Sequence, residues 1–122
     1  MPVAVRALRG ATTFDVDQPE HVTGRVVDLV RAMLDRNVVE HDDIVSILFT
    51  ATGDLTSVFP ATAARSIGLG DVPLICAREL DVAGGMPRCV RVLMHVETGR
   101  SRSELRHVYL EGARSLRDDL PE

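Results

Sequence analysis

Hydrophobic and polar residues follow two different periods along this chain. Between residues 22 and 34, apolar side chains recur every three or four positions, which is typical of a helix that buries one stripe. The members of this stripe are Val22, Val26, Leu29, Val30, Met33 and Leu34. Residues 89–96 instead alternate from position to position, as in a strand that buries one face. The pattern therefore predicts helices and strands in one fold.

The first helix has recognisable boundaries. Asp17 is a candidate N-cap, Pro19 suits the first turn and Glu20 stands in the capping-box position. The helix is expected to end near Asn37. Its opposite face is charged and is predicted to be solvated; its residues are Arg25, Asp28, Arg31, Asp35 and Arg36.

A second, shorter helix is predicted to begin at Pro60, to run through Arg65 to Ile67 and to stop at Gly68. Beyond residue 110 the chain is expected to form a short helix or a tail.

Four further segments are predicted to be strands. Residues 3–9 form the first, closed by residues 10–13, so Arg9 is predicted at its end. Residues 43–51 are apolar on both faces and are predicted to be a central, covered strand. Residues 72–76 contain Pro73 and suit an edge.

Residues 106–110 are the last predicted strand. Strands alternating with helices predict an α/β domain over residues 1–122, with a mixed β-sheet, helices on one face and no appended regulatory domain.

The strand at residues 89–96 places an arginine away from the core. Its even positions, Val90 to Val96, are apolar and point inward, so Arg91 must point to the other face. That face also carries Cys89 and Leu93 and is expected to be covered. A covered arginine needs an anionic partner.

Composition excludes several classes of function. A net charge of −4, no Trp and one Tyr argue against nucleic acid as a partner, and the absence of a long apolar run argues against a membrane protein. We therefore expect a cytoplasmic protein. Aromatic residues make up only 3% of the chain, so the core must be aliphatic and the domain is expected to gain from oligomerisation.

The two cysteines, Cys76 and Cys89, lack a C-x-x-C spacing and are expected to be free thiols. Neither redox nor zinc chemistry is indicated. All fourteen basic residues are arginine, so an arginine gains meaning only from its position.

The chain lacks the usual catalytic motifs: there is no G-x-S-x-G, no Walker loop, no G-x-G-x-x-G and no His pair at metal spacing. Several arginines near the ends of predicted elements remain, with a few other reactive side chains, and they suit a small polyanion. These candidate residues are Arg9, Arg65, Arg91, Glu79, Cys76 and Tyr109.

Five segments together, in matching order and spacing, resemble the monofunctional chorismate mutases of the AroH class. They are Arg9-Gly10-Ala11-Thr12-Thr13, Val58-Phe59-Pro60-Ala61, residues 76–85, Cys89-Val90-Arg91-Val92 and Arg106-His107-Val108-Tyr109-Leu110.

The resemblance implies a homotrimer whose sheets pack into a pseudo-α/β barrel, with active sites between subunits. It also implies that chorismate is converted to prephenate by an intramolecular Claisen rearrangement, without a cofactor or a metal, on the way to phenylalanine and tyrosine.

The same resemblance implies a role for each matching residue. Arg91 would approach the ether oxygen of chorismate, Arg9 would bind a carboxylate and Tyr109 would donate to the bound anion. Glu79 and Cys76 would contact the ring hydroxyl. Phe59 and Ala61 would form an apolar wall. The residues that would surround the entrance are Arg65, Leu116 and Arg117.

One departure and two alternatives stay open. Thr62 stands where a basic residue is common in the family, so an auxiliary charge is missing. The nearest enzymatic alternative is an imine deaminase of similar trimeric architecture, although Glu79 and the strand around Arg91 favour the mutase. A non-catalytic trimer that senses a small dicarboxylate would bind chorismate without consuming it.

Overall fold

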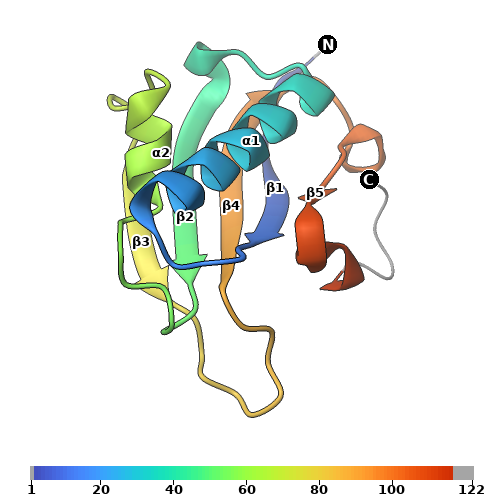
Figure 1. Ribbon diagram of the computed structural model, residues 1–122. Coiled ribbons are helices and arrows are strands. Elements are labelled where there is room, and N and C mark those ends of the chain that lie inside the picture. The colour runs from blue at the N-terminus through green and yellow to red at the C-terminus, as the bar shows by residue number, and fades with distance from the viewer. Residues whose placement is uncertain (1, 117–122) are drawn as a thin grey trace.

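Five strands in the order β3-β2-β4-β1-β5 form the sheet of the computed structural model, which describes residues 2–116 (Figure 1). The strands are β1 (Ala4–Thr13), β2 (Ile44–Ala51), β3 (Leu74–Arg78), β4 (Cys89–Thr98) and β5 (Val108–Tyr109). Strand β4 is antiparallel to β1 and β2, whereas β1–β5 and β2–β3 are parallel pairs. The predicted mixed sheet is confirmed.

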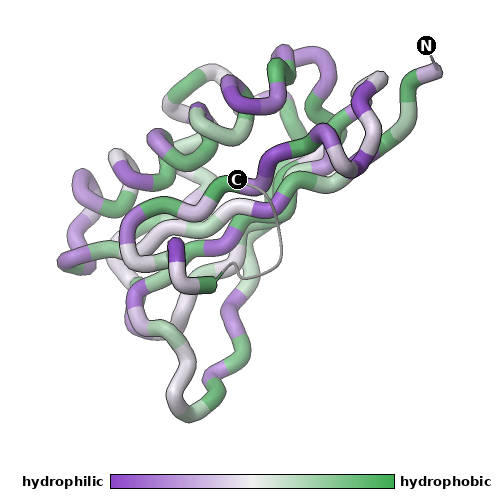
Figure 2. Tube along the Cα trace, turned by 90° about the vertical axis from the view of Figure 1, so that its right-hand side faces the viewer, coloured by the Kyte–Doolittle hydropathy of each residue, from purple (hydrophilic) through white to green (hydrophobic). Residues whose placement is uncertain are grey.

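Helices α1 (Pro19–Asn37) and α2 (Ala61–Ser66) cover one face of this sheet, as predicted (Figure 1). The short 3₁₀ segments are η1 (His41–Asp43), η2 (Arg102–Glu104) and η3 (Glu111–Leu116). Figure 2 shows α1 stacked beside the strands when the sheet is seen from the side.

The core lies between α1 and the sheet. The predicted stripe is buried except for Leu34, which is partly buried. Gly10 of β1 allows α1 to come close, because a Cβ atom there would lie 2.5 Å from the Met33 sulfur. From β4, Val90, Val92, Met94 and Val96 enter the same core, which confirms the predicted alternation.

One buried polar residue connects α1 to the segment before β5. Asn37 is 1% exposed, and its Nδ2 donates to the carbonyl oxygens of Met33 and Arg106, both at 2.8 Å. Its Oδ1 accepts the Arg106 N–H at 2.7 Å. The end of α1, predicted near Asn37, is thereby fixed against the segment that leads into β5.

The predicted N-cap of α1 is wrong. The N-cap is Gln18, which makes no side-chain cap bond, although Pro19 does begin the helix. The Asp17 carboxylate instead accepts the N–H groups of Thr56 and Ser57 at 2.9 and 3.2 Å. Hydrogen bonds from Ser57 and Thr56 lower the pKa of Asp17. Asp17 therefore ties the loop before α2 to the start of α1.

Several strand boundaries also differ from prediction. Residues 10–13 continue β1 because they pair with Cys89 to Val92 of β4, so Arg9 lies within the strand and not at its end. Strand β2 is interior but second from the edge, because β4 is the middle strand. Strand β5 keeps only two residues of the predicted 106–110, whereas β3 is an edge strand as Pro73 indicated.

The sheet face opposite the helices is open within the described chain. Val5, Ala7, Arg9 and Arg91 are exposed on it, although this face was expected to be covered. No helix within residues 2–116 is long and apolar enough to cross a membrane.

Candidate active site

A cleft of about 320 Å³, which we call the Arg91 cleft, lies on this open face. The β3–β4 loop projects from the end of the sheet at which β3 ends and β4 begins (Figure 1). Five predicted site residues line the cleft: Arg9, Glu79, Arg91, Tyr109 and Leu116. They come from β1, β4, β5, η3 and, for Glu79, the position directly after β3. The fold thus brings together residues as far apart in the sequence as Arg9 and Leu116.

Glu79 and Arg91 form an ion pair inside the cleft. The Arg91 Nε lies 3.3 Å from the Glu79 Oε1, and the Glu79 side chain is only 20% exposed. Thr50, directly opposite Arg91 on β2, donates its hydroxyl hydrogen to the Glu79 Oε2. Among the described residues, no hydrogen bond engages the terminal nitrogens of Arg91, so they are available to an anion.

A histidine holds the backbone at Arg9. The Arg9 N–H donates to the His107 Nδ1 at 2.9 Å, which requires the neutral imidazole with its proton on Nε2. Burial, and then the charge of Arg9, lower the pKa of His107. Arg9 itself remains exposed on the open face and is directed to the solvent side of the sheet.

The loop between Glu79 and Arg91 is fastened at its base by Thr52, Asp54 and Arg88, which we call the Asp54 clasp. The Arg88 N–H donates to both carboxylate oxygens of Asp54, at 3.2 and 3.0 Å. The Thr52 hydroxyl donates to Asp54 at 2.5 Å and accepts the Cys89 N–H at 3.0 Å. Arg88 has a φ of +42°, a strained conformation for a non-glycine residue that these contacts maintain.

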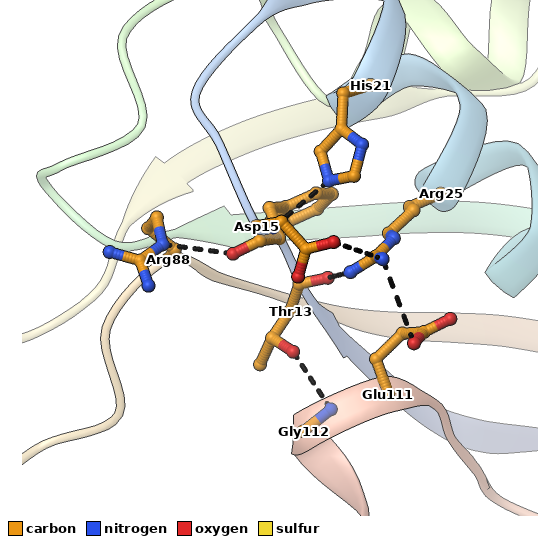
Figure 3. A network of polar contacts seen from close by, with 8 residues as sticks. Thr13, Asp15, His21, Arg25, Arg88, Glu111 and Gly112 are labelled. Atoms are coloured by element: carbon orange, nitrogen blue, oxygen red, sulfur yellow. Dashed lines mark hydrogen bonds and ion pairs between the residues drawn. The ribbon is translucent and has the colours of Figure 1, made fainter.

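A polar network secures the segment that carries Tyr109 and Leu116 (Figure 3). Arg25 of α1 donates to the Thr13 carbonyl and to Asp15, both at 2.9 Å, and lies 3.8 Å from Glu111. The Gly112 N–H donates to the Thr13 hydroxyl at 2.9 Å. The prediction that the Arg25 charge is merely solvated is therefore wrong, because Arg25 joins α1, β1 and η3.

Cys89 is a packing residue and, as expected, a free thiol. It is 1% exposed and lies in a small cluster with Ala11, Tyr109 and Ala113 beneath the cleft. Burial raises the pKa of its thiol to about 11, so it stays protonated at neutral pH. Cys76 is also a free thiol.

Known proteins resemble this chain in sequence and in fold. The family model described as "Chorismate mutase type I" matches residues 5–120. The chain belongs to this family.

Two curated relatives, both named chorismate mutase AroH, support this membership. The protein of Thermus thermophilus is 44% identical over 117 residues, which cover 95% of this chain and 96% of the relative. That of Bacillus subtilis (strain 168) is 41% identical over 117 residues, or 95% and 92% of the two chains. A solved chorismate mutase from Clostridium thermocellum is 42% identical with a TM-score of 0.89, covering 90% of this chain and 98% of that one.

Within residues 2–116, the other site residues predicted from the chorismate mutase resemblance lie outside the Arg91 cleft. Phe59 and Cys76 line a separate hollow of about 510 Å³, which we call the Phe59 hollow. Phe59 is 72% exposed, whereas Ala61 is buried in the core at 2%. Arg65 is exposed on α2.

Arg117 lies outside the described residues, and Thr62 is partly buried on α2.

Sequence reasoning missed two polar residues at the site. Thr50 lines the Arg91 cleft, and Asp54 belongs to the clasp. The period-two pattern of β2 held a signal for Thr50, because Leu48 and Thr50 share one face. Asp54 carried no comparable signal, because it acts on Arg88, 34 positions later in the chain.

Proposed function

We propose that this protein is a chorismate mutase that converts chorismate to prephenate in the Arg91 cleft. The observation that supports this most strongly is a fixed cation: Arg91 is held through Nε by Glu79 and keeps its terminal nitrogens free within the described chain. Arg9 and Tyr109 supply further donors on the same wall. Such a wall suits a small dianion with a polar ether at its centre.

The proposed reaction moves only electron pairs within the substrate. The ether carbon–oxygen bond of chorismate breaks while a carbon–carbon bond forms at the other end of the side chain, so no proton or leaving group has to be accepted. Negative charge develops on the ether oxygen in the transition state. Arg91 stabilises this charge, and the other contacts hold the reactive diaxial conformer.

Each remaining residue has a proposed role. Arg9 binds a carboxylate, Tyr109 donates to the bound anion, and Glu79 with Cys76 contacts the ring hydroxyl. The residues proposed to form an apolar wall and to surround the entrance are Phe59, Ala61, Arg65, Leu116 and Arg117.

We also propose a homotrimer with sites between subunits. Phe59 and Cys76 lie in a different hollow from Arg91 in one chain, so a second chain would have to bring its Phe59 hollow to the Arg91 cleft. The edge strand β3 exposes Ile75 by 64%, and Phe59 is exposed by 72%. Large exposed apolar side chains next to a site suit a subunit interface. The expected cytoplasmic location belongs to this proposal as well.

The test is to mix purified protein with chorismate and to follow both the loss of chorismate and the appearance of prephenate. We expect catalytic turnover in buffer without any added cofactor or metal. Binding of chorismate without its consumption would contradict the proposal and favour a dicarboxylate sensor. Hydrolysis of an imine acid in place of chorismate turnover would favour the deaminase alternative.

A further inference from the structure

The proposed mechanism gives no role to the hydrogen bond between Thr50 and Glu79. Thr50 stands on β2 directly opposite Arg91 on β4 and opposite Ala77 on β3. Its hydroxyl donates to one carboxylate oxygen of Glu79, while the other oxygen pairs with Arg91. Thr50 of β2, Arg91 of β4 and Glu79, which directly follows β3, thus form one set of contacting polar side chains in the wall of the Arg91 cleft.

Without the Thr50 hydrogen bond, few contacts would hold the Glu79 side chain in one conformation. Its backbone is anchored, since its N–H donates to the Ala51 carbonyl at 2.9 Å. The loop that follows is exposed, with Leu80 exposed by 88%. A glutamate side chain has several rotamers to choose from, and a partly exposed ion pair at 3.3 Å fixes it only weakly.

The Thr50 hydroxyl also affects which nitrogens of the Arg91 guanidinium pair with Glu79. With one oxygen bound to Thr50, Glu79 presents a single oxygen to the Arg91 Nε. If Glu79 were free to rotate, it could form a two-point pair with the guanidinium and occupy the nitrogens that the substrate needs. A hydrogen bond to a charged group is among the stronger ones in proteins, so one hydroxyl can decide between these arrangements.

We propose that Thr50 is a positioning residue that fixes Glu79, and through Glu79 keeps the terminal nitrogens of Arg91 directed at the ligand. The inference rests on the proposed function of the Arg91 cleft. It assigns no contact between Thr50 and the reacting atoms.

The experiment compares Thr50→Val with Thr50→Ser. Valine keeps the shape and the strand preference of threonine but has no hydroxyl, whereas serine keeps the hydroxyl. We expect Thr50→Val to lower kcat for chorismate by about tenfold or more, with a smaller change in KM, and Thr50→Ser to stay within about threefold of wild type. Equal activity of Thr50→Val and wild type, or equal losses in both variants, would overturn the inference.

Two further measurements separate positioning from general stability. In a Glu79→Ala background, Thr50→Val should cost much less activity than it does in wild type, because the carboxylate that Thr50 orients is absent. An additive loss would contradict the inference.

Crystal structures of both variants provide a readout that does not depend on turnover. Glu79 should leave its single-oxygen contact with the Arg91 Nε in Thr50→Val and keep it in Thr50→Ser. An unmoved Glu79 in Thr50→Val would overturn the inference even if wild-type protein rearranges chorismate. Conversely, failure of wild type to consume chorismate would remove the proposed function and leave this structural comparison intact.

Discussion

At the scale of single residues, the proposed site depends on polar groups whose partners lie far away in the sequence. His107 is one example, because its ring accepts the Arg9 N–H from a strand 98 positions earlier. Only the neutral ring can accept this hydrogen bond. The lowered pKa of His107, caused first by burial and then by Arg9, agrees with this requirement.

This pKa predicts the pH dependence of stability. Below the ordinary value of 6.5, the unfolded chain protonates His107 while the folded chain does not, so the free energy of unfolding should fall as the pH drops towards the folded pKa. Chemical denaturation at fixed protein concentration between about pH 7 and pH 5 measures this slope.

The matched variant is His107→Asn, whose side-chain oxygen can accept the Arg9 N–H but does not titrate in this range. We expect its slope to be shallower than that of wild type. Asp17 and Glu104, whose pKa values are lowered by hydrogen bonds, are present in both proteins and cancel in the comparison. Identical slopes would show that His107 does not gain a proton on unfolding.

At the scale of elements, the β3–β4 loop connects Glu79 to the strand that carries Arg91. The Asp54 clasp holds the Arg88–Cys89 end of this loop to the segment after β2, and the Glu79 N–H holds the other end to the Ala51 carbonyl. Asp54→Ala should release the loop, speed tryptic cleavage after Arg88 and lower kcat/KM for chorismate by about tenfold.

Two variants act as controls for the clasp. Asp54→Asn keeps one carbonyl oxygen for the Thr52 hydroxyl and the Arg88 N–H, so it should retain most activity. Asp28→Ala removes an exposed carboxylate from α1 and should change neither cleavage nor activity. If Asp54→Ala were as active and as resistant to trypsin as Asp28→Ala, the clasp would have no role in positioning the site.

Local patterns predicted the elements well and their long-range contacts poorly. The alternation of residues 89–96 placed Arg91 opposite the core, because side chains alternate strictly along a strand. Asp17 was assigned to a helix cap because capping is a local rule, but its oxygens bind a loop 39 positions later. Strand β1 was predicted too short because the pairing of Gly10 to Thr13 with β4 leaves no local signal.

Some residues of the candidate site could be predicted from the sequence and others could not. Motifs of the family resemblance named Arg9, Glu79, Arg91, Tyr109 and Leu116, and the fold brings these five into one cleft. Composition and hydrophobic period could not have predicted that these residues meet, since they lie on four separate elements and one loop. Thr50 escaped notice because threonine on a strand is ordinary, and only the tertiary contact with Glu79 gives it meaning.

At the scale of the whole molecule, the proposed active site requires residues from two neighbouring chains. Subunit mixing tests this requirement. Arg91→Ala removes the cation of the cleft, and Phe59→Asp places a negative charge on the opposing wall, where it would repel a dianion. Each variant alone should be nearly inactive, although its solution mass should still be that of three chains.

Refolding the two variants together should restore activity. If Arg91 and Phe59 of one site come from different subunits, random trimers contain both intact groups in about a quarter of their sites, and about that share of wild-type activity should return. If both residues come from one subunit, every site keeps a defect and no activity returns. A stable, active monomer would likewise contradict the interfacial site.

The central claim is that a preorganised cation at Arg91 accelerates the rearrangement of chorismate, and the turnover of an Arg91→Gln protein tests it most directly. Loss of the charge should cost on the order of 3 kcal/mol in barrier, or a fall in kcat of about a hundredfold or more, with an unchanged fold and trimer. Arg31→Gln, on the exposed face of α1, should behave like wild type. Near-normal prephenate formation by a folded Arg91→Gln protein would contradict the account.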